Sequence, residues 1–173
     1  MPVVTESTIT PDLTIRRATV DDAEALARLR WEFRTAIDPA NETEDEFVAR
    51  CAAWMRTRLR DATWRAWVVE MDGEIVGTAW LNQVEKMPNP VVEAEAYGYV
   101  TNVYLREHLR GRGAGARLLG AVMDECVAAG VDAGFLWPTE RSRSLYRRFG
   151  FEGDGPLMVW RGNTAAEGHA PAR

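Results

Sequence analysis

The chain has 173 residues, of which 46% are hydrophobic and 27% charged, and its net charge at pH 7 is −5. These values are typical of a globular domain, and the acidic balance argues against a nucleic-acid partner. No stretch approaches the roughly 20 apolar residues of a membrane span, and the N-terminus lacks the pattern of a signal peptide. We therefore expect a cytoplasmic protein with no membrane partner.

Chain ends and cysteines set the next expectations. Residues 1–11 are predicted to form a flexible arm and residues 162–173 a disordered tail, which leaves a single domain at 12–161. Cys51 and Cys126 lie in helical patterns, and the sequence has only two histidines. Since these are too few soft ligands for a metal centre, we expect no metal and two reduced, partly buried thiols.

The first predicted elements are one strand and two helices. A short strand is expected at Leu13–Arg17, followed by a helix from about Asp21 to Ala36 with apolar residues at helical spacing. Thr43 and Glu46 form a capping box, which predicts the start of a second helix that reaches about Leu59.

A hairpin and a further strand are expected next. The Asp72-Gly73 pair favours a type I′ turn between strands at Trp64–Met71 and Glu74–Glu85. After a loop at Lys86–Pro90, the aromatic and β-branched residues of Tyr97–Leu105 predict another strand.

The last four predicted elements alternate between helix and strand. They are a helix at Gly113–Ala129, a strand at Ala133–Trp137, a short helix at Ser142–Phe149 and a strand at Leu157–Arg161. The resulting order, β α α β β β α β α β, places antiparallel pairs first and a strand–helix–strand crossover later. We therefore predict an α/β fold with helices on the faces of the sheet.

The stretch LRGRGAGARLL, residues Leu109 to Leu119, joins a predicted strand to a predicted helix. The first N–H groups of a helix lack internal partners, and the helix dipole adds partial positive charge there. Glycines let phosphate oxygens approach such a turn, and Arg110, Arg112 and Arg117 add charge. The turn therefore predicts a binding site for a diphosphate.

Other readings of this turn are possible. The nucleotide P-loop is excluded, because it ends in Gly-Lys-Ser/Thr and this turn continues as Gly-Ala-Arg. The dinucleotide fingerprint is partly met by Gly111, Gly113 and Ala116, but Asp132 precedes the next strand, whereas a ribose-binding acid follows one. A helix start whose glycines serve packing alone is the remaining alternative.

Two motifs carry a resemblance to a known family. Arg110-x-x-Gly113-x-Gly115 resembles the acyl-CoA signature of the GNAT superfamily of N-acetyltransferases, and the segment from Leu145 to Phe151, LYRRFGF, resembles its L-Y-x-x-x-G-F motif. The order of elements over residues 13–161 resembles the family fold. The resemblance implies a mixed, mostly antiparallel sheet, acetyl-CoA as cosubstrate and an acetyltransferase activity.

The resemblance also implies residue roles. Backbone N–H groups of the glycine turn would hold the pyrophosphate, and Val103 and Leu105, on a strand that splays from its neighbour at a bulge, would pair with the pantetheine arm. Tyr146 would lie beside the thioester sulfur. Thr139 stands where many members have Asn. The implied cosubstrate-binding residues are Val103, Tyr104, Leu105, Arg110, Gly111, Arg112, Gly113, Ala114, Gly115, Thr139, Ser142 and Tyr146.

The chemistry requires an amine freed of its proton and a stabilised thiolate. Some family members carry a catalytic Glu where this chain has Tyr99, so the base is open among Tyr99, Glu95, Glu93 and Glu140. Tyr146 would stabilise the departing thiolate by hydrogen bonding. Neither cysteine has a His beside it in the sequence, so we expect direct attack in a ternary complex.

The acceptor is expected to be a small-molecule or peptide primary amine, bound between the first two helices and the loop after Glu85. A noncatalytic acyl-CoA sensor is the alternative function, and the resemblance allows for a homodimer. Most tryptophans are expected in the core, with one free to line the acceptor pocket. The acidic residues of the acceptor segments are Asp38, Glu42, Glu44, Asp45, Glu46, Glu85, Glu93 and Glu95.

Overall fold

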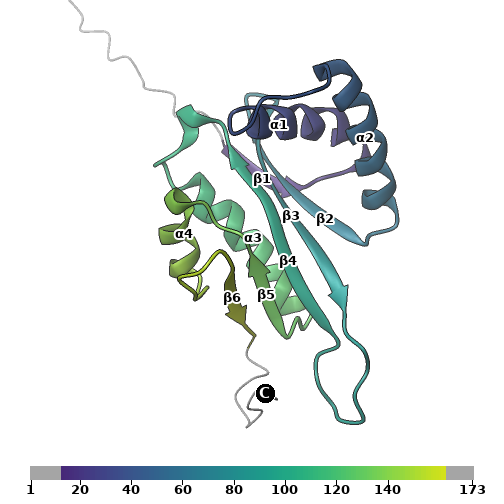
Figure 1. The fold of residues 1–173 in the computed structure, drawn as a ribbon, viewed down its shortest axis with the longest axis vertical. Helices are drawn as coiled ribbons and strands as arrows, with labels where there is room; N and C mark the ends of the chain where they lie inside the picture. Colours follow the sequence, from purple (N-terminus) through teal and green to yellow (C-terminus); the bar gives the residue numbers. More distant parts are fainter. Residues whose placement is uncertain (1–12, 163–173) are drawn as a thin grey trace, which may run out of the picture.

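The computed structural model describes residues 13–162. Their strands form one six-stranded sheet in the order β1-β2-β3-β4-β5-β6, in which every neighbouring pair is antiparallel except β4 and β5 (Figure 1). The strands are β1 (Leu13–Arg17), β2 (Trp64–Met71), β3 (Glu74–Glu85), β4 (Ala96–Leu105), β5 (Ala133–Leu136) and β6 (Met158–Arg161).

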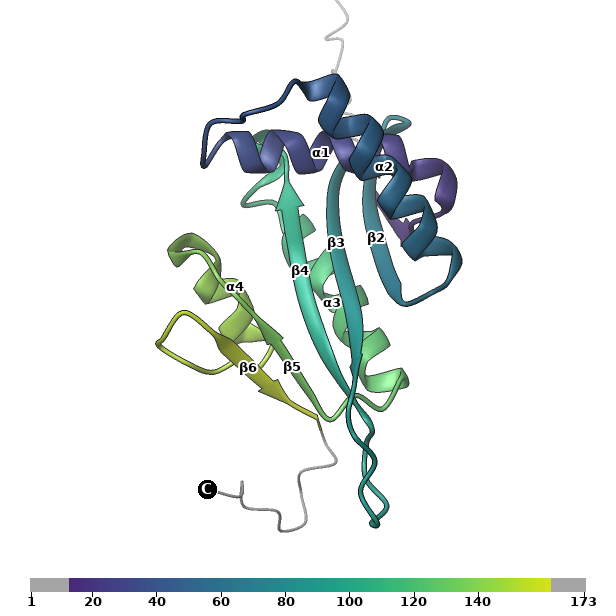
Figure 2. The same cartoon turned by 45° about the vertical axis from the view of Figure 1, so that its right-hand side comes forward.

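Helices cover both faces of this sheet. The helices α1 (Ala23–Thr35) and α2 (Glu44–Arg60) pack over one face, and α3 (Ala114–Ala128) and α4 (Arg143–Arg148) lie on the other (Figures 1 and 2). The predicted element order and the mostly antiparallel mixed sheet are confirmed. Short 3₁₀ turns precede α1 and α4, so both helices begin later than the sequence predicted.

Two hydrophobic cores lie on opposite faces of the sheet. The α3 core includes the helical repeat of Leu118, Leu119 and Val122, and the other core packs α1 and α2 against Trp80. Cys126 is fully buried in the α3 core rather than partly buried as expected, because it continues the apolar face of α3. Cys51 is partly buried, and both thiols are free.

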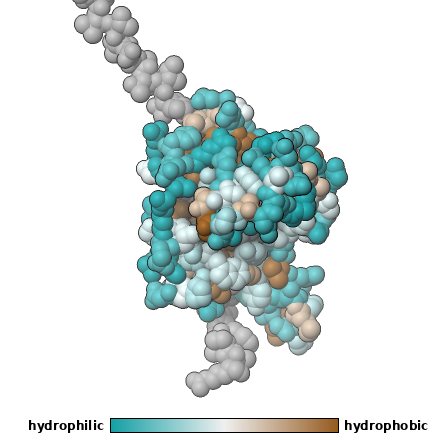
Figure 3. All heavy atoms as spheres, turned by 45° about the horizontal axis from the view of Figure 1, so that its top comes forward, coloured by the Kyte–Doolittle hydropathy of each residue, from teal (hydrophilic) through white to brown (hydrophobic). Residues whose placement is uncertain are grey.

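The outer surface around α1 and α2 is mostly hydrophilic (Figure 3). None of the helices within residues 13–162 combines the length and the hydropathy that crossing a membrane would require. The predicted arm at 1–11 lies outside the described residues, as does the predicted tail apart from Gly162.

Candidate active site

The two parallel strands at the centre of the site separate after three residue pairs. Tyr97, Gly98 and Tyr99 of β4 pair with Ala133, Gly134 and Phe135 of β5, and no later pair joins the two strands. Beyond this point they diverge as a V, visible in Figure 2. The splay predicted from the family resemblance is therefore present, and it leaves the end of β4 without a partner on the β5 side.

A bulge in β4 accompanies this split. Tyr104 is opposite Thr78 and Thr101 is opposite Trp80, so Asn102 and Val103 together face one residue of β3. Asn102 adopts a left-handed conformation with φ of 51°. Asn tolerates this conformation better than most residues, and bulges often re-aim a strand next to an active site.

The bulge sets which backbone groups point into the split. The Arg106 N–H donates to the Val76 carbonyl on β3 at 3.0 Å, so the alternate residues Leu105 and Val103 present their N–H and C=O groups to the open side. Arg110 Nε donates to the Leu105 carbonyl oxygen at 3.2 Å. The free edge predicted at Val103 and Leu105 is thus oriented toward the split, with Arg110 at its end.

The glycine turn lies at the open end of the V, between β4 and α3. Gly111 and Gly113 have φ values of 76° and 81°, and a Cβ added at either would meet nothing within 4 Å. Gly113 is the N-cap of α3, and no side chain caps this helix. Packing therefore does not explain these two glycines. At Gly115, in contrast, an added Cβ would lie 3.4 Å from Leu105 Cδ1.

Positive charge near the turn comes from Arg110 and Arg112, since Arg117 Nη2 donates instead to the Leu13 carbonyl at 3.2 Å. The N–H groups that begin α3 have no capping side chain, and the space around Gly111 and Gly113 is open. This combination of free donors, helix dipole and arginines can bind an anion.

Tyr146 lies on α4 and is buried, with 6% of the residue exposed. The ring packs edge-on against Phe151, with 5.9 Å between centroids. Burial raises the pKa of Tyr146 to about 12, and the nearby Ser142 hydroxyl partly offsets this rise. The phenol therefore stays protonated at any physiological pH.

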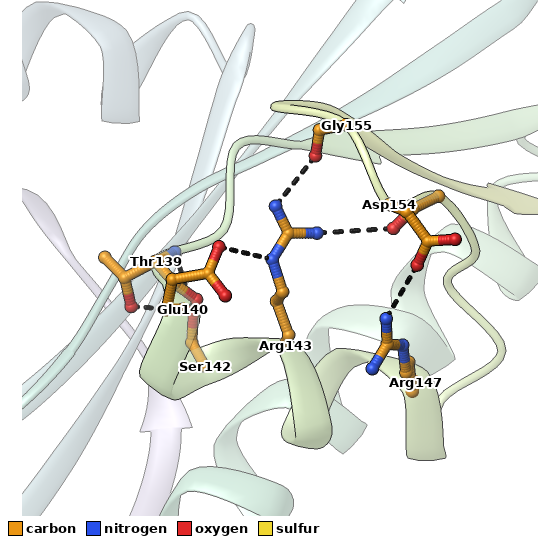
Figure 4. A network of polar contacts seen from close by, with 8 residues as sticks. Thr139, Glu140, Ser142, Arg143, Arg147, Asp154 and Gly155 are labelled. Carbon is orange, nitrogen blue, oxygen red and sulfur yellow. Dashed lines mark hydrogen bonds and ion pairs between the residues drawn. The ribbon is translucent and has the colours of Figure 1, made fainter.

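A polar network holds α4 in place (Figure 4). Arg143 contacts Glu140 at 3.0 Å and donates to the carbonyls of Gly153 at 3.3 Å and Gly155 at 2.8 Å. Arg147 pairs with Asp154 at 2.9 Å. These contacts tie the helix that carries Tyr146 to the loop before β6.

Thr139 and Ser142 are both expected to contact the cosubstrate. In the structure they form hydrogen bonds with each other. The Thr139 N–H donates to Ser142 Oγ at 2.9 Å, and the two hydroxyl oxygens are 3.0 Å apart (Figure 4). The pair forms the cap of the turn that leads into α4.

The candidate bases occupy different places. Tyr99 lies where the split begins, and its hydroxyl donates to Thr101 Oγ1 at 3.1 Å. Glu95 is exposed in the loop before β4, at the end of the strand opposite the glycine turn. Glu93 in the same loop pairs with Lys86 at 3.3 Å, and Glu140 with Arg143. The structure thus brings Tyr99 to the split and leaves Glu95 and Glu93 away from it.

The loop after Glu85 projects from the end of the sheet opposite the connection between α1 and α2 (Figures 1 and 2). The two segments therefore do not enclose one acceptor pocket, contrary to the sequence interpretation. Four of the eight acidic residues of the acceptor segments are also paired with an arginine or a lysine. The ion pairs are Asp38–Arg34, Glu42–Arg50, Glu44–Arg28 and Glu93–Lys86.

Sequence reasoning missed two polar residues at the bulge. Arg30 Nη1 donates to Asn102 Oδ1 at 3.1 Å, which links α1 to β4. The sequence does hold a signal for Arg30. It is a charged residue at the position where the helical spacing of Ala23, Leu26 and Ala27 would place the next residue of the buried face of α1. Within residues 13–162, no His, Cys, Asp and Glu side chains gather in a group of three that could hold a metal.

Comparison with known proteins agrees with this geometry. The acetyltransferase (GNAT) family matches residues 23–151. An uncharacterized N-acetyltransferase of Archaeoglobus fulgidus is 26% identical over 140 residues, which cover 78% of this chain and 87% of the relative.

Solved structures share the fold. A GCN5-related N-acetyltransferase from Ralstonia eutropha is 25% identical, with a TM-score of 0.66, and the match covers 93% of this chain and 99% of that one. A predicted acetyltransferase from Clostridium acetobutylicum is 21% identical, with a TM-score of 0.69 and coverage of 82% and 91%. The chain belongs to the acetyltransferase (GNAT) family and is an acetyltransferase.

Proposed function

We propose that the protein transfers an acetyl group from acetyl-CoA to a primary amine. The observation that carries this proposal is the V between β4 and β5, which opens toward an uncapped helix start at Gly113. The backbone of residues 110–115 binds the pyrophosphate of coenzyme A, and Val103 and Leu105 pair with the amides of its pantetheine arm.

The neighbouring structures support coenzyme A as the cosubstrate. The Clostridium acetobutylicum acetyltransferase contains acetyl-CoA, and an N-acetyltransferase from Thermoplasma acidophilum contains coenzyme A. Both share the fold that forms the split here. The backbone groups that face the split and the glycine turn in this chain fit a ligand that combines a diphosphate with extended amides.

The transfer proceeds by direct attack in a ternary complex. The amine nitrogen bonds to the thioester carbonyl carbon, the carbon–sulfur bond breaks, and the sulfur leaves as a thiolate that solvent protonates. Tyr146 donates a hydrogen bond to this thiolate. With its pKa at about 12, full proton transfer to a thiolate of pKa about 8.5 would be uphill by roughly 5 kcal/mol, so Tyr146 keeps its proton.

The amine must lose a proton. We assign Tyr99 as the first group on the path by which this proton reaches solvent. Its hydroxyl already contacts Thr101 at the opening of the split. Glu95 lies outside the split and has no direct part in this proposal. The thiols of Cys51 and Cys126 stay protonated because burial raises the pKa of each, which agrees with the absence of a covalent intermediate from the mechanism.

Calorimetry with acetyl-CoA and a thiol-release assay with a panel of primary amines test the proposal together. We expect saturable binding at one site per chain and release of coenzyme A that depends on an added amine. Binding without thiol release from any amine would favour the alternative, an acyl-CoA sensor. No binding at all would remove the proposal.

A further inference from the structure

Arg30 is a partly buried arginine on the face of α1 that is directed toward the sheet. Its neighbours on the helix pair with carboxylates, Arg28 with Glu44 at 3.0 Å and Arg34 with Asp38 at 3.5 Å. Within residues 13–162, no carboxylate forms an ion pair with Arg30. Its one hydrogen bond there is to a neutral amide oxygen, Asn102 Oδ1.

The surroundings of Arg30 make an anionic partner favourable. Burial, together with the like charge of Arg34, lowers its pKa from the ordinary value, but an arginine remains charged at neutral pH. A guanidinium has five N–H donors, and one of them is used by Asn102. A charge removed from water without a counter-ion is costly, so a bound carboxylate would be held strongly here.

Arg30 lies beside the part of β4 where acetyl transfer is proposed. Asn102 is the bulge residue on the unpaired end of β4, and Tyr99 and Thr101, joined by a hydroxyl contact of 3.1 Å, precede it on the same strand. The Tyr99 phenol lies close enough to Arg30 to raise the pKa of the guanidinium, against the larger lowering by burial. When the amine of an acceptor reaches this segment, the groups on the carbon that bears the amine therefore lie close to Arg30.

An aromatic wall continues from Tyr99 across the split. We define it as Trp64, Tyr99, Phe135 and Trp137. Tyr99 stacks on Phe135 with centroids 5.3 Å apart and meets Trp137 edge-on at 5.4 Å and Trp64 at 6.1 Å. Trp137 remains 58% exposed. Such a wall binds a large apolar or aromatic group better than a small polar one.

We propose that the acceptor is a free amino acid with a large apolar side chain, whose carboxylate binds Arg30 and whose side chain packs on the aromatic wall. This assignment rests on the proposed N-acetyltransferase function and names its substrate class. In an amino acid a single carbon separates the amine from the carboxylate. This short separation fits an anion site at Arg30, next to the part of β4 where acetyl transfer is proposed.

Phenylalanine and 2-phenylethylamine form the test pair, because they differ only in the carboxylate. For the wild type we expect kcat/KM for phenylalanine to exceed that for 2-phenylethylamine by about 10- to 100-fold. Arg30→Met keeps most of the apolar volume and removes the charge, so this ratio should fall toward one, mainly through KM for phenylalanine. The KM for acetyl-CoA should stay within about twofold of wild type.

Two further variants separate a binding role from a structural one. Arg34→Met removes an exposed arginine one turn later on α1 and should keep the wild-type ratio. Arg30→Lys keeps the charge and should retain part of the preference, which a purely structural role would not produce. Alanine as a third acceptor should react at least about tenfold less well than phenylalanine if the aromatic wall binds the side chain.

The wild-type pair alone can overturn the inference, even if Arg30→Met fails to fold. Equal or better acetylation of 2-phenylethylamine would disprove the carboxylate site while leaving the N-acetyltransferase function intact. Equal loss of activity on both acceptors in Arg30→Met would likewise contradict it. Failure of every amine to release thiol would instead be a failure of the proposed function.

Discussion

Arg106 and Glu32 form a two-point ion pair that joins the end of β4 to α1. Arg106 Nη2 lies 2.8 Å from Glu32 Oε1, and its Nε donates to Oε2 at 3.1 Å. The same guanidinium is 3.5 Å from Glu74 at the start of β3. Because Arg106 immediately follows Leu105, this pair holds the unpaired end of β4 and the approach to the glycine turn against two other elements.

Glu32→Gln should therefore loosen the end of β4. We expect the free energy of unfolding to fall by about 1 kcal/mol and the dissociation constant of acetyl-CoA to rise a few-fold. Urea unfolding and calorimetry measure the two effects. Glu24→Gln is the control, since Glu24 pairs with Arg28 on the exposed side of the same helix. A Glu32→Gln protein that binds acetyl-CoA like the control would contradict this role.

Gly113→Ala should weaken binding of acetyl-CoA about tenfold or more. The added Cβ enters the open space where the pyrophosphate is proposed to bind, and alanine is strained at a φ of 81°. Gly73 provides a matched control, because it has the same φ of 81° and equally open surroundings in the hairpin turn.

Both glycine variants should lose about 1 kcal/mol of unfolding free energy from the strained backbone. Calorimetry with acetyl-CoA then separates strain from binding, since the affinity should change at Gly113 alone. Equal affinities of the two variants would place the pyrophosphate elsewhere.

Tyr146→Phe should lower kcat by about 10- to 100-fold, because a hydrogen bond to a developing thiolate is a charged one. The ring remains packed against Phe151, so the KM for acetyl-CoA should change less than about twofold. Tyr97→Phe, on an exposed tyrosine near the start of β4, is the control for the loss of a hydroxyl. Wild-type turnover by Tyr146→Phe, with chemistry established as the slow step, would leave the residue a packing role.

Asp22 should make stability depend on pH in the acidic range. Arg16 donates to its two carboxylate oxygens at 2.8 and 2.9 Å and holds the pKa of Asp22 below its ordinary value. The folded protein thus binds this proton less readily than the unfolded chain. The stabilisation is complete above the unfolded pKa of about 3.9 and is lost as the pH falls through the lower folded value.

Unfolding free energies at pH 6 and at pH 3 should therefore differ less in Asp22→Asn than in the wild type. Asp154→Asn, which removes a carboxylate that is 96% exposed, serves as the control. If the change between the two pH values were as large in Asp22→Asn as in the wild type, the pair with Arg16 would not stabilise the fold.

Much of this fold is predictable because its signals are local. The Asp72-Gly73 turn, the capping box of Thr43 and the apolar spacing of α3 each specify one element from adjacent residues. The glycine turn also has a local signal in the sequence, because Gly111 and Gly113 adopt positive φ values that glycine permits.

The acceptor side was predicted poorly because it depends on contacts between distant segments. Arg30 and Asn102 are 72 residues apart. In the aromatic wall, Tyr99 meets Phe135 and Trp137 only when β4 and β5 pair. Acidic residues near the second helix suggest a site for a cationic amine in the sequence, but the fold gives Asp38, Glu42 and Glu44 arginine partners. Pairing of this kind has no signature in the order of residues.

The unpaired run at the end of β4 also bears on how the protein behaves when it is concentrated. Backbone donors and acceptors without a neighbouring strand are a template for any extended polypeptide, and this template lies inside the sheet rather than at its rim. Preparations that contain coenzyme A should accordingly stay monodisperse longer than preparations without it, because the bound coenzyme would occupy the open side of β4 and block pairing with another chain.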